Sequence, residues 1–275
     1  MVVGGPLPRV GPVIAAGWPD LVDELDRWQE AGRVAKLWWR DDDATAPSVA
    51  LDRLITIADK TPVALAVIPA LAQPELADRL SCYARSDRQS EISILQHGWR
   101  HVSHSASGKK SEFPAGRSDF DVCFELAAGR ERLGELFGTQ ALPVLVPPWN
   151  RFDDCFLPLL SGCRLYAISR ATPRRSLWPV PDVFEVNIHV DLVGWAADRG
   201  FIGVEAALGA LVTYLRGCRL GGCAEGPAGI LTHHLIQDER TDEFVQRLLE
   251  VTGNHTGARW LNAREVFAEV MPVAI

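Results

Sequence analysis

Acidic and imidazole side chains follow several short apolar segments of this 275-residue sequence. Three aspartates, 41–43, follow the apolar run 35–39 after a single residue, Arg40. Five of the seven histidines follow two further runs of this kind, at His97, His101, His104, His233 and His234. Two imidazoles and one carboxylate are a common ligand set for a catalytic divalent cation, because they leave positions open for water and substrate. The sequence therefore predicts metal-assisted catalysis.

The aspartate triplet suits a division of roles between a metal ligand and a base. Adjacent carboxylates repel each other unless a cation or a proton separates them, so one is expected on the metal while its neighbour exchanges protons. Side chains alternate along a strand, which predicts Asp41 and Asp43 on one face and Asp42 on the other. A helical turn directly after the predicted strand 91–96 would bring His97 and His101 to one side of the chain, where they could share a cation. Each feature alone has an ordinary explanation, and their joint placement favours a site.

Strands and helices alternate along the sequence, which predicts a parallel sheet covered by helices. Apolar runs predict strands at 35–39, 63–69, 91–96, 142–146, 164–169, 183–190 and 228–234. Amphipathic spacing predicts helices at 21–32 (capped by Asp20), 47–60, 75–84, 121–138, 204–217 and 241–253. The polar candidates stand at the C-terminal ends of strands, where parallel barrels carry their active sites, and no glycine-rich phosphate loop follows the first strand. Both features favour a barrel over a doubly wound sheet.

Composition and charge limit the class of protein. Hydrophobic residues make up 47% and charged residues 23%, as in globular proteins. The net charge is -7 and no Lys/Arg run exceeds two residues, so we expect no nucleic-acid partner. The sequence contains no run of about 18 apolar residues, so we expect no membrane-spanning helix. We predict a leader and helix over 1–33, a catalytic domain over 34–275, a cytoplasmic location without a secretory signal, and free, buried thiols at all six cysteines.

Four short motifs stand in a fixed order, each at the end of a predicted strand. They are Asp42-Asp43-Ala44, His97 to His101, Pro147-Pro148-Trp149 and Leu231-Thr232-His233. In type and order this set resembles the polysaccharide deacetylases, the superfamily of NodB homologues and family 4 carbohydrate esterases. The resemblance extends over about residues 34–270.

The resemblance implies a fold, a reaction and a role for each matching residue. The fold implied is a distorted (β/α)7 barrel in a single α/β domain. The reaction implied is metal-dependent removal of an acyl group, usually acetyl, from an amide nitrogen of a carbohydrate or related small metabolite. Asp42 would be the general base and His233 the general acid, while Trp149, beside Pro148, would line the pocket for the acyl methyl group. A divalent metal, zinc in preference to cobalt, nickel or manganese, would be bound by Asp43, His97 and His101.

The sequence departs from the family pattern in three places. Val146 stands where the family usually has an arginine that orients the base, and Arg40 or Arg151 is expected to replace it. The acidic, tryptophan-bearing fourth motif is matched only loosely, by Asp191 and Trp195. Family members that act on cell-wall polymers are usually exported, and no export signal is recognised. These departures leave the substrate more open than the hydrolytic chemistry.

Three other interpretations follow from the same residues. The barrel would also suit a non-sugar amide or a cyclic imide. A metal-binding or ligand-binding domain without catalysis is a second possibility, although it would not require Asp42 or His233. A doubly wound phosphohydrolase with an aspartate nucleophile is a third, and it would leave His97 and His101 without a role.

The adjacent histidines near the C-terminus present a choice, since only one of two neighbours on a strand faces the barrel mouth. The Leu-x-His pattern selects His233, so His234 is expected to pack outward or reach solvent. Asp191 or Asp238 is expected to raise the pKa of His233. His104 is the reserve metal ligand.

Overall fold

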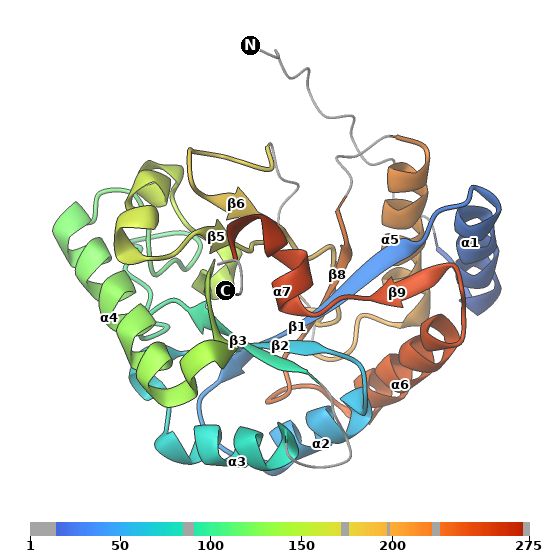
Figure 1. Cartoon of the computed structure of the whole chain (residues 1–275), viewed down its shortest axis with the longest axis horizontal. Coiled ribbons are helices and arrows are strands. Elements are labelled where there is room, and N and C mark those ends of the chain that lie inside the picture. The colour runs from blue at the N-terminus through green and yellow to red at the C-terminus, as the bar shows by residue number, and fades with distance from the viewer. Residues whose placement is uncertain (1–14, 85–90, 172–175, 197–198, 222–225, 272–275) are drawn as a thin grey trace.

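Parallel strands curl into an incomplete barrel, with helices in an arc on its outer side (Figure 1). The computed structural model describes residues 15–84, 91–171, 176–196, 199–221 and 226–271. Within these residues the strand order is β6-β5-β4-β3-β2-β1-β8-β7, and β9 pairs with β1. The prediction of a single-domain distorted (β/α) barrel is confirmed.

The elements follow the predicted order with shifted bounds. The strands are β1 (Ala35–Ala44), β2 (Val63–Val67), β3 (Ile92–His97), β4 (Ala141–Val146), β5 (Ala167–Ile168), β6 (Phe184–Glu185), β7 (Val190–Asp191), β8 (Ala228–Thr232) and β9 (Ala258–Trp260). The helices are α1 (Trp18–Glu30), α2 (Val49–Ala58), α3 (Pro74–Ala84), α4 (Asp119–Phe137), α5 (Val204–Arg219), α6 (Glu239–Gly253) and α7 (Ala263–Val266). β9 and α7 were not predicted.

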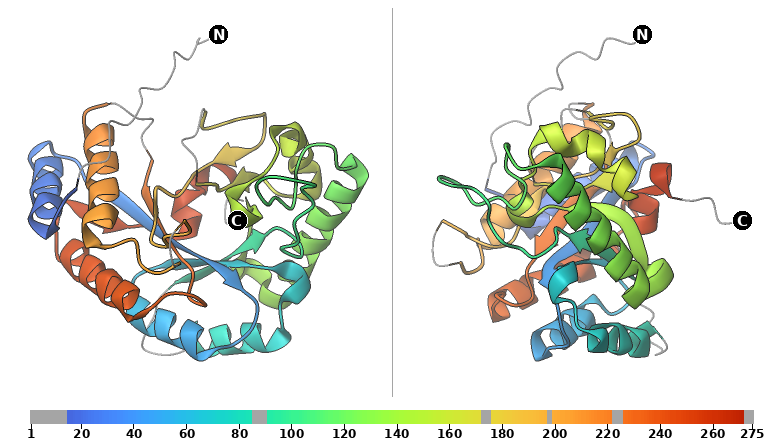
Figure 2. Two further views of the ribbon diagram at one scale, coloured as in Figure 1. Left: turned by 180° about the vertical axis from the view of Figure 1, so that it is seen from behind. Right: turned by 90° about the vertical axis from the view of Figure 1, so that its left-hand side faces the viewer.

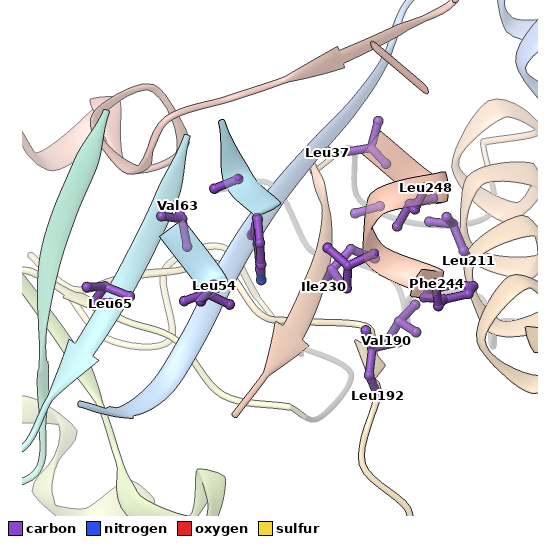
Figure 3. Close-up of a cluster of buried hydrophobic side chains, with 14 of the residues drawn as sticks. Leu37, Leu54, Val63, Leu65, Val190, Leu192, Leu211, Ile230, Phe244 and Leu248 are labelled. Carbon is purple, nitrogen blue, oxygen red and sulfur yellow. The ribbon is translucent and has the colours of Figure 1, made fainter. Parts of the chain in front are cut away.

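Alternate residues of the strands face the helices and form the larger core. Leu37 of β1 and Ile230 of β8 meet Leu211 of α5 and Leu248 of α6 in this layer (Figure 3). Strands covered in this way are buried on both faces, which explains their near-continuous apolar sequences. Each fully buried aliphatic side chain stabilises the fold by about 1.5–3 kcal/mol. The core therefore holds β1 and β8 firmly at a fixed register.

A second core fills the barrel interior and is closed at one end by α7. Trp38 of β1 points inward and meets Phe267 edge-on, with ring centroids 5.7 Å apart. In the side view of Figure 2, α7 lies on one side of the barrel and the loop after β3 projects from the other. The open end is therefore the one at which the parallel strands finish.

The segment 183–190 was predicted as one strand and forms two. β6 pairs with β5 and β7 pairs with β8, at opposite edges of the sheet. Between them the N–H of Val186 donates to the carbonyl of Ile168 at 3.2 Å, and the N–H of His189 donates to the carbonyl of Gly229 at 2.7 Å. The segment therefore crosses the open side of the barrel and ties one edge to the other.

The start of α1 differs from the prediction. The helix begins at Trp18, and Asp20 lies in its first turn, where it accepts the N–H of Gly17 at 2.7 Å. Asp20 is therefore not the N-cap residue, because the helix begins three residues earlier than predicted, with Pro19 in its first turn. Glu24 of α1 is buried and binds Arg219 of α5 at 2.7 Å, so the helix packs on the barrel. The division at residue 33 stays a prediction.

Cysteine pairing also differs in part. Cys82, Cys123, Cys155 and Cys163 are free, as predicted, but Cys82 and Cys155 are exposed, so the prediction of buried thiols is wrong for these two. Cys218 is disulfide-bonded, so the free-thiol prediction is wrong there, and Cys223 lies outside the described residues. None of the described helices combines the length and apolar composition needed to span a bilayer. The cytoplasmic location stays a prediction.

Candidate metal and catalytic site

The end of β1 is bent, so that the consecutive residues Asp42 and Asp43 face the same site. The register of β1 on β2 shifts between Asp41 and Ala44, and Asp43 has a φ of +75°. This irregularity breaks the strand alternation, so the prediction that Asp43 shares a face with Asp41 is wrong. The carboxylate of Asp43 turns instead toward His97 and His101. A left-handed backbone costs roughly 1–3 kcal/mol and persists only where surrounding contacts hold it.

Asp43, His97 and His101 meet at one point, as predicted. Oδ1 of Asp43 lies 3.1 Å from Nε2 of His97 and 3.3 Å from Nε2 of His101. One ligand atom from each residue lies within 4.8 Å of the others. Nδ1 of His97 donates to the carbonyl of Val146 at 3.0 Å, which leaves Nε2 as the ring nitrogen that faces the group and would present its lone pair to a metal. This donor set fits a divalent cation such as zinc.

The charge of Asp43 suits a metal ligand. Burial acts to raise its pKa, but the hydrogen bond from His97 and the positive charges of His97, His101 and His233 outweigh burial and lower the pKa. Asp43 is therefore ionised at neutral pH. Ionised carboxylate is the form that binds a cation.

A short loop places His101, and the predicted helical turn is wrong. Gly98 and His101 have left-handed backbones, with φ values of +58° and +59°. The buried carboxylate of Glu112 accepts the N–H groups of Trp99, Arg100 and His101 at 3.1, 2.7 and 3.1 Å. Sequence reasoning missed Glu112, because it lies in the polar segment 103–117 and resembles a solvated loop residue.

Asp42 points into the barrel and is held by Arg40. Nε and Nη2 of Arg40 lie 2.9 and 3.0 Å from the two carboxylate oxygens of Asp42, and both side chains are buried. The remaining guanidinium donors reach Oγ of Ser169 at 2.8 Å and Oδ1 of Asn150 at 2.7 Å. Arg40 thus contacts the carboxylate of Asp42 directly. This is the role that the sequence predicted for Arg40 or Arg151, because Val146 stands at the position of the family's arginine. Ser169 and Asn150 were not predicted as site residues, although Ser169 is the last residue of one predicted strand and Asn150 stands four residues after another.

The other two reserve candidates lie elsewhere. Nη1 of Arg151 donates to the carbonyl of Lys110 at 2.8 Å, and no contact with Asp42 is seen among the described residues. His104 is exposed, its N–H donates to the carbonyl of Ser111 at 2.8 Å, and it stands outside the three-residue group. Arg40 is therefore the arginine beside Asp42.

His233 lies between the metal-ligand group and the end of β7. Its ring meets the ring of Trp195 edge-on at 4.9 Å, and Nε1 of Trp195 donates to Asp191 at 2.7 Å. Burial raises the pKa of Asp191, and the positive charge of His233 partly counteracts this rise. Asp238 instead caps α6, accepting the N–H of Thr241 at 2.9 Å. Of the two acids named from the sequence, Asp191 and not Asp238 is therefore the one whose charge interacts with His233.

His234 turns to the outer face of the sheet, as alternation predicts. Its Nδ1 lies 2.5 Å from Oδ1 of Asp41, and its N–H donates to Oδ2 at 3.0 Å. Oγ1 of Thr232 also donates to Asp41, at 2.6 Å. Burial acts to lower the pKa of His234, but the charge of Asp41 and their hydrogen bond raise it.

The Pro-Pro-Trp segment forms a wall beside His101. Trp149 has a φ of +55°, and its ring lies 4.4 Å from the His101 ring. Pro148 is buried against the loop, since a Cβ added at Gly98 would lie 2.6 Å from its Cδ. Nζ of Lys110 stands 5.9 Å from the ring centroid of Trp149. The segment thus lies next to the metal-ligand group.

No protein-family model and no curated protein matches the sequence, but several solved structures share its fold. A candidate polysaccharide deacetylase from Mycobacterium smegmatis is 17% identical, with a TM-score of 0.61 over 97% of this chain and 98% of its own. A family 4 acetyl xylan esterase from Clostridium thermocellum, in complex with a cobalt ion, is 15% identical, with a TM-score of 0.52 over 85% and 91%. A peptidoglycan N-acetylglucosamine deacetylase is 15% identical, with a TM-score of 0.51 over 86% and 89%. At these identities the likeness shows a common fold, the one that the motif resemblance implied.

Proposed function

We propose that this protein, which has the fold of polysaccharide deacetylases and family 4 carbohydrate esterases, is a metal-dependent hydrolase. Its reaction would be removal of an acetyl group from an amide nitrogen of a carbohydrate or a related small metabolite. One observation carries the proposal: the three-ligand group is flanked by two side chains suited to proton transfer, Asp42 and His233. Metal binding alone requires neither residue, so their presence supports catalysis over a binding domain.

A divalent cation held by Asp43, His97 and His101 would supply Lewis-acid activation of the acyl carbonyl and of water. We propose zinc as this cation because imidazole and carboxylate ligands suit it. Cobalt, nickel and manganese are the alternatives, and cobalt is the ion bound in the fold neighbour from Clostridium thermocellum.

Asp42 would act as the general base. As the water oxygen bonds to the acyl carbon, one carboxylate oxygen of Asp42 takes the proton that the water loses. The two contacts from Arg40 fix the plane of this carboxylate, so its remaining lone pairs keep one direction. Ser169 and Asn150 in turn fix the guanidinium.

His233 would act as the general acid. When the carbon–nitrogen bond breaks, the imidazole donates a proton to the nitrogen, which leaves as an amine while the acyl group leaves as a carboxylic acid. Trp195 packs against the imidazole, and Asp191 places a carboxylate near it. Trp149, beside His101, would contact the methyl group of the acetyl substituent.

The proposal is tested by product analysis with the full-length, zinc-loaded protein. N-acetylglucosamine oligomers, acetylated xylan oligomers and a cyclic imide would be compared as substrates. We expect acetate and free amine in equal amounts from the N-acetylated oligomers, and neither product with His97→Ala. Reconstitution with cobalt, nickel or manganese ranks the metals.

Other outcomes would contradict parts of this proposal. Release of acetate from the xylan alone would indicate an esterase. Ring opening of the imide alone would support the non-sugar amidohydrolase. Metal binding without turnover of an extended panel of N-acyl compounds would favour a binding domain.

A further inference from the structure

The loop that carries His101 is folded around a carboxylate of the protein itself. Glu112 is 1% exposed, and its two oxygens accept three successive backbone N–H groups, from Trp99, Arg100 and His101. Consecutive N–H groups that point to one side form a nest for an anion. Here that anion is a side chain supplied from outside the loop, eleven positions beyond His101.

Three further main-chain groups of the loop also have partners. The N–H of Gly98 donates to the carbonyl of Val146 at 3.1 Å, and Nε2 of the buried Gln96 donates to the carbonyl of Gly98 at 3.2 Å. The N–H of Ala70 donates to the carbonyl of Trp99 at 3.0 Å. Because these bonds are all made within the protein, the loop can keep one conformation without a bound ligand.

Gly98 shows how closely the carboxylate approaches the loop. A Cβ at this position would overlap Oε2 of Glu112 and would lie 2.6 Å from Cδ of Pro148. The φ of +58° also favours glycine. Glu112 is itself fixed, since its carbonyl accepts Nη1 of Arg117 at 3.0 Å, and the same nitrogen binds Glu125 of α4 at 2.7 Å. Glu112 is thus linked to α4 through its carbonyl and Arg117, and to the loop through its carboxylate.

We propose that Glu112 is a positioning residue that holds His101 in its ligand geometry before a metal arrives. The inference rests on the proposed metal site. His101 adopts a left-handed backbone that costs roughly 1–3 kcal/mol. Three hydrogen bonds to a carboxylate are strong enough to offset that cost. Without the carboxylate, three N–H groups lose their acceptor, and the His101 imidazole moves away from Asp43.

The first experiment measures cobalt binding by metal-free, full-length protein. Cobalt affinity and the visible absorption spectrum would be compared for wild type, Glu112→Gln and Glu24→Gln. Glutamine keeps the shape but presents one acceptor oxygen in place of two. We expect Glu112→Gln to bind cobalt about 10–100-fold more weakly, the usual effect of losing an outer-shell partner, with a changed spectrum. Wild-type affinity and spectrum in Glu112→Gln would overturn the inference.

Glu24→Gln is the matched control. Glu24 is also a glutamate with 1% exposure, and it binds Arg219 outside the site. We expect both variants to lose stability, but only Glu112→Gln to lose cobalt affinity. If both lose affinity equally, the effect is general destabilisation and the inference fails. If wild type binds no better than His97→Ala, the metal site itself is wrong, which separates that failure from a failure at Glu112.

A second measurement needs no variant and applies even if Glu112→Gln does not fold. Amide hydrogen exchange would be followed by NMR in wild-type protein, without metal and with zinc. We expect the amides of Trp99, Arg100 and His101 to exchange slowly in the metal-free protein. Fast exchange that becomes slow only after zinc is added would show that the metal orders the loop, and would overturn the inference.

Discussion

Asp41 and His234 form a buried pair on the outer face of the sheet, with Oδ1 and Nδ1 2.5 Å apart. The pair joins the end of β1 to the segment that follows β8. Asp42 and His233 are the immediate chain neighbours of its two members, and both turn toward the barrel mouth. The separation of the proposed base and the proposed acid is therefore set by a contact on the opposite face of the same strands.

Replacing His234 should destabilise the protein most strongly at low pH. Asp41 raises the pKa of His234 above its unfolded value of 6.5, despite the opposing effect of burial. The stabilising contribution is thus complete below pH 6.5 and declines as the pH rises toward the folded pKa. Breaking a buried pair costs about 3–5 kcal/mol. Urea unfolding of His234→Gln should show a deficit of this order at about pH 5.5, and a smaller one at about pH 8.5.

His255→Gln is the control for this measurement. His255 also binds an aspartate, Asp26 at 3.2 Å, but the Asp26 side chain is 55% exposed. Solvent screens such a pair, so we expect a loss below about 1 kcal/mol. A His234→Gln deficit that grows with pH would contradict the charged pair.

Metal content should depend on three residues and not on a fourth. Elemental analysis of His97→Ala, His101→Ala and Asp43→Ala should show little bound metal, because each removes one donor of the set. His104→Ala should keep the wild-type content, since His104 is exposed and stands outside the group. The assignment fails if His104→Ala loses the metal and His101→Ala retains it.

Asp42→Asn should keep the metal and lose turnover. An amide cannot take a proton from water, and loss of a general base lowers kcat by about 10²–10⁴. The zinc-loaded variant would be compared with wild type by measuring the rate of acetate release, and metal content would be measured on the same samples. Normal kcat at full metal occupancy would refute the role of Asp42.

Arg40→Lys tests the orientation of the base. Lysine keeps the positive charge, but it cannot make two parallel bonds to Asp42 and also reach Ser169 and Asn150. We expect kcat to fall while KM and metal content change little, because the metal ligands and Trp149 are untouched. Arg151 keeps its charge in the same exchange and has no contact with Asp42 among the described residues, so an equal loss from Arg151→Lys would indicate that the effect of Arg40→Lys does not come from its contacts with Asp42.

His233→Ala should be sensitive to the leaving group. An amide nitrogen needs a proton to depart, whereas the alcohol of an activated ester leaves without one. We therefore expect a large loss of kcat with an N-acetylated sugar and a smaller loss with an activated acetyl ester, at unchanged metal content. Equal losses on both substrates would assign His233 a role other than general acid.

Period-2 alternation explains how much of the site could be predicted from the sequence. It places Arg40 and Asp42 inward on β1, and it separates His233 from His234. It fails at Asp43, because the shifted register and the left-handed φ arise from contacts with His97 and His101, which are distant in the sequence. A single-residue irregularity of this kind leaves no trace in local residue types.

Sequence analysis missed the partners that depend on tertiary structure. Glu112 lies in a polar segment that has the composition of a solvated loop, and only the folded chain buries its carboxylate. The segment 183–190 carries a continuous β-rich pattern, yet it pairs with two different edges because the barrel is open there. β9 is three residues long and too short to give a periodic signal.

The stretch from Val186 to His189 connects the two sheet edges and has a fixed length. One end is bonded to β5 and the other to β8, so its span is fixed by the width of the opening. Asp191, beside the proposed acid, comes two residues after it. Adding one residue would displace Asp191 along the chain by about 3.3 Å, more than a hydrogen bond can absorb. We therefore expect this stretch not to accept changes of length, which a scan of single-residue insertions measures through acetate release.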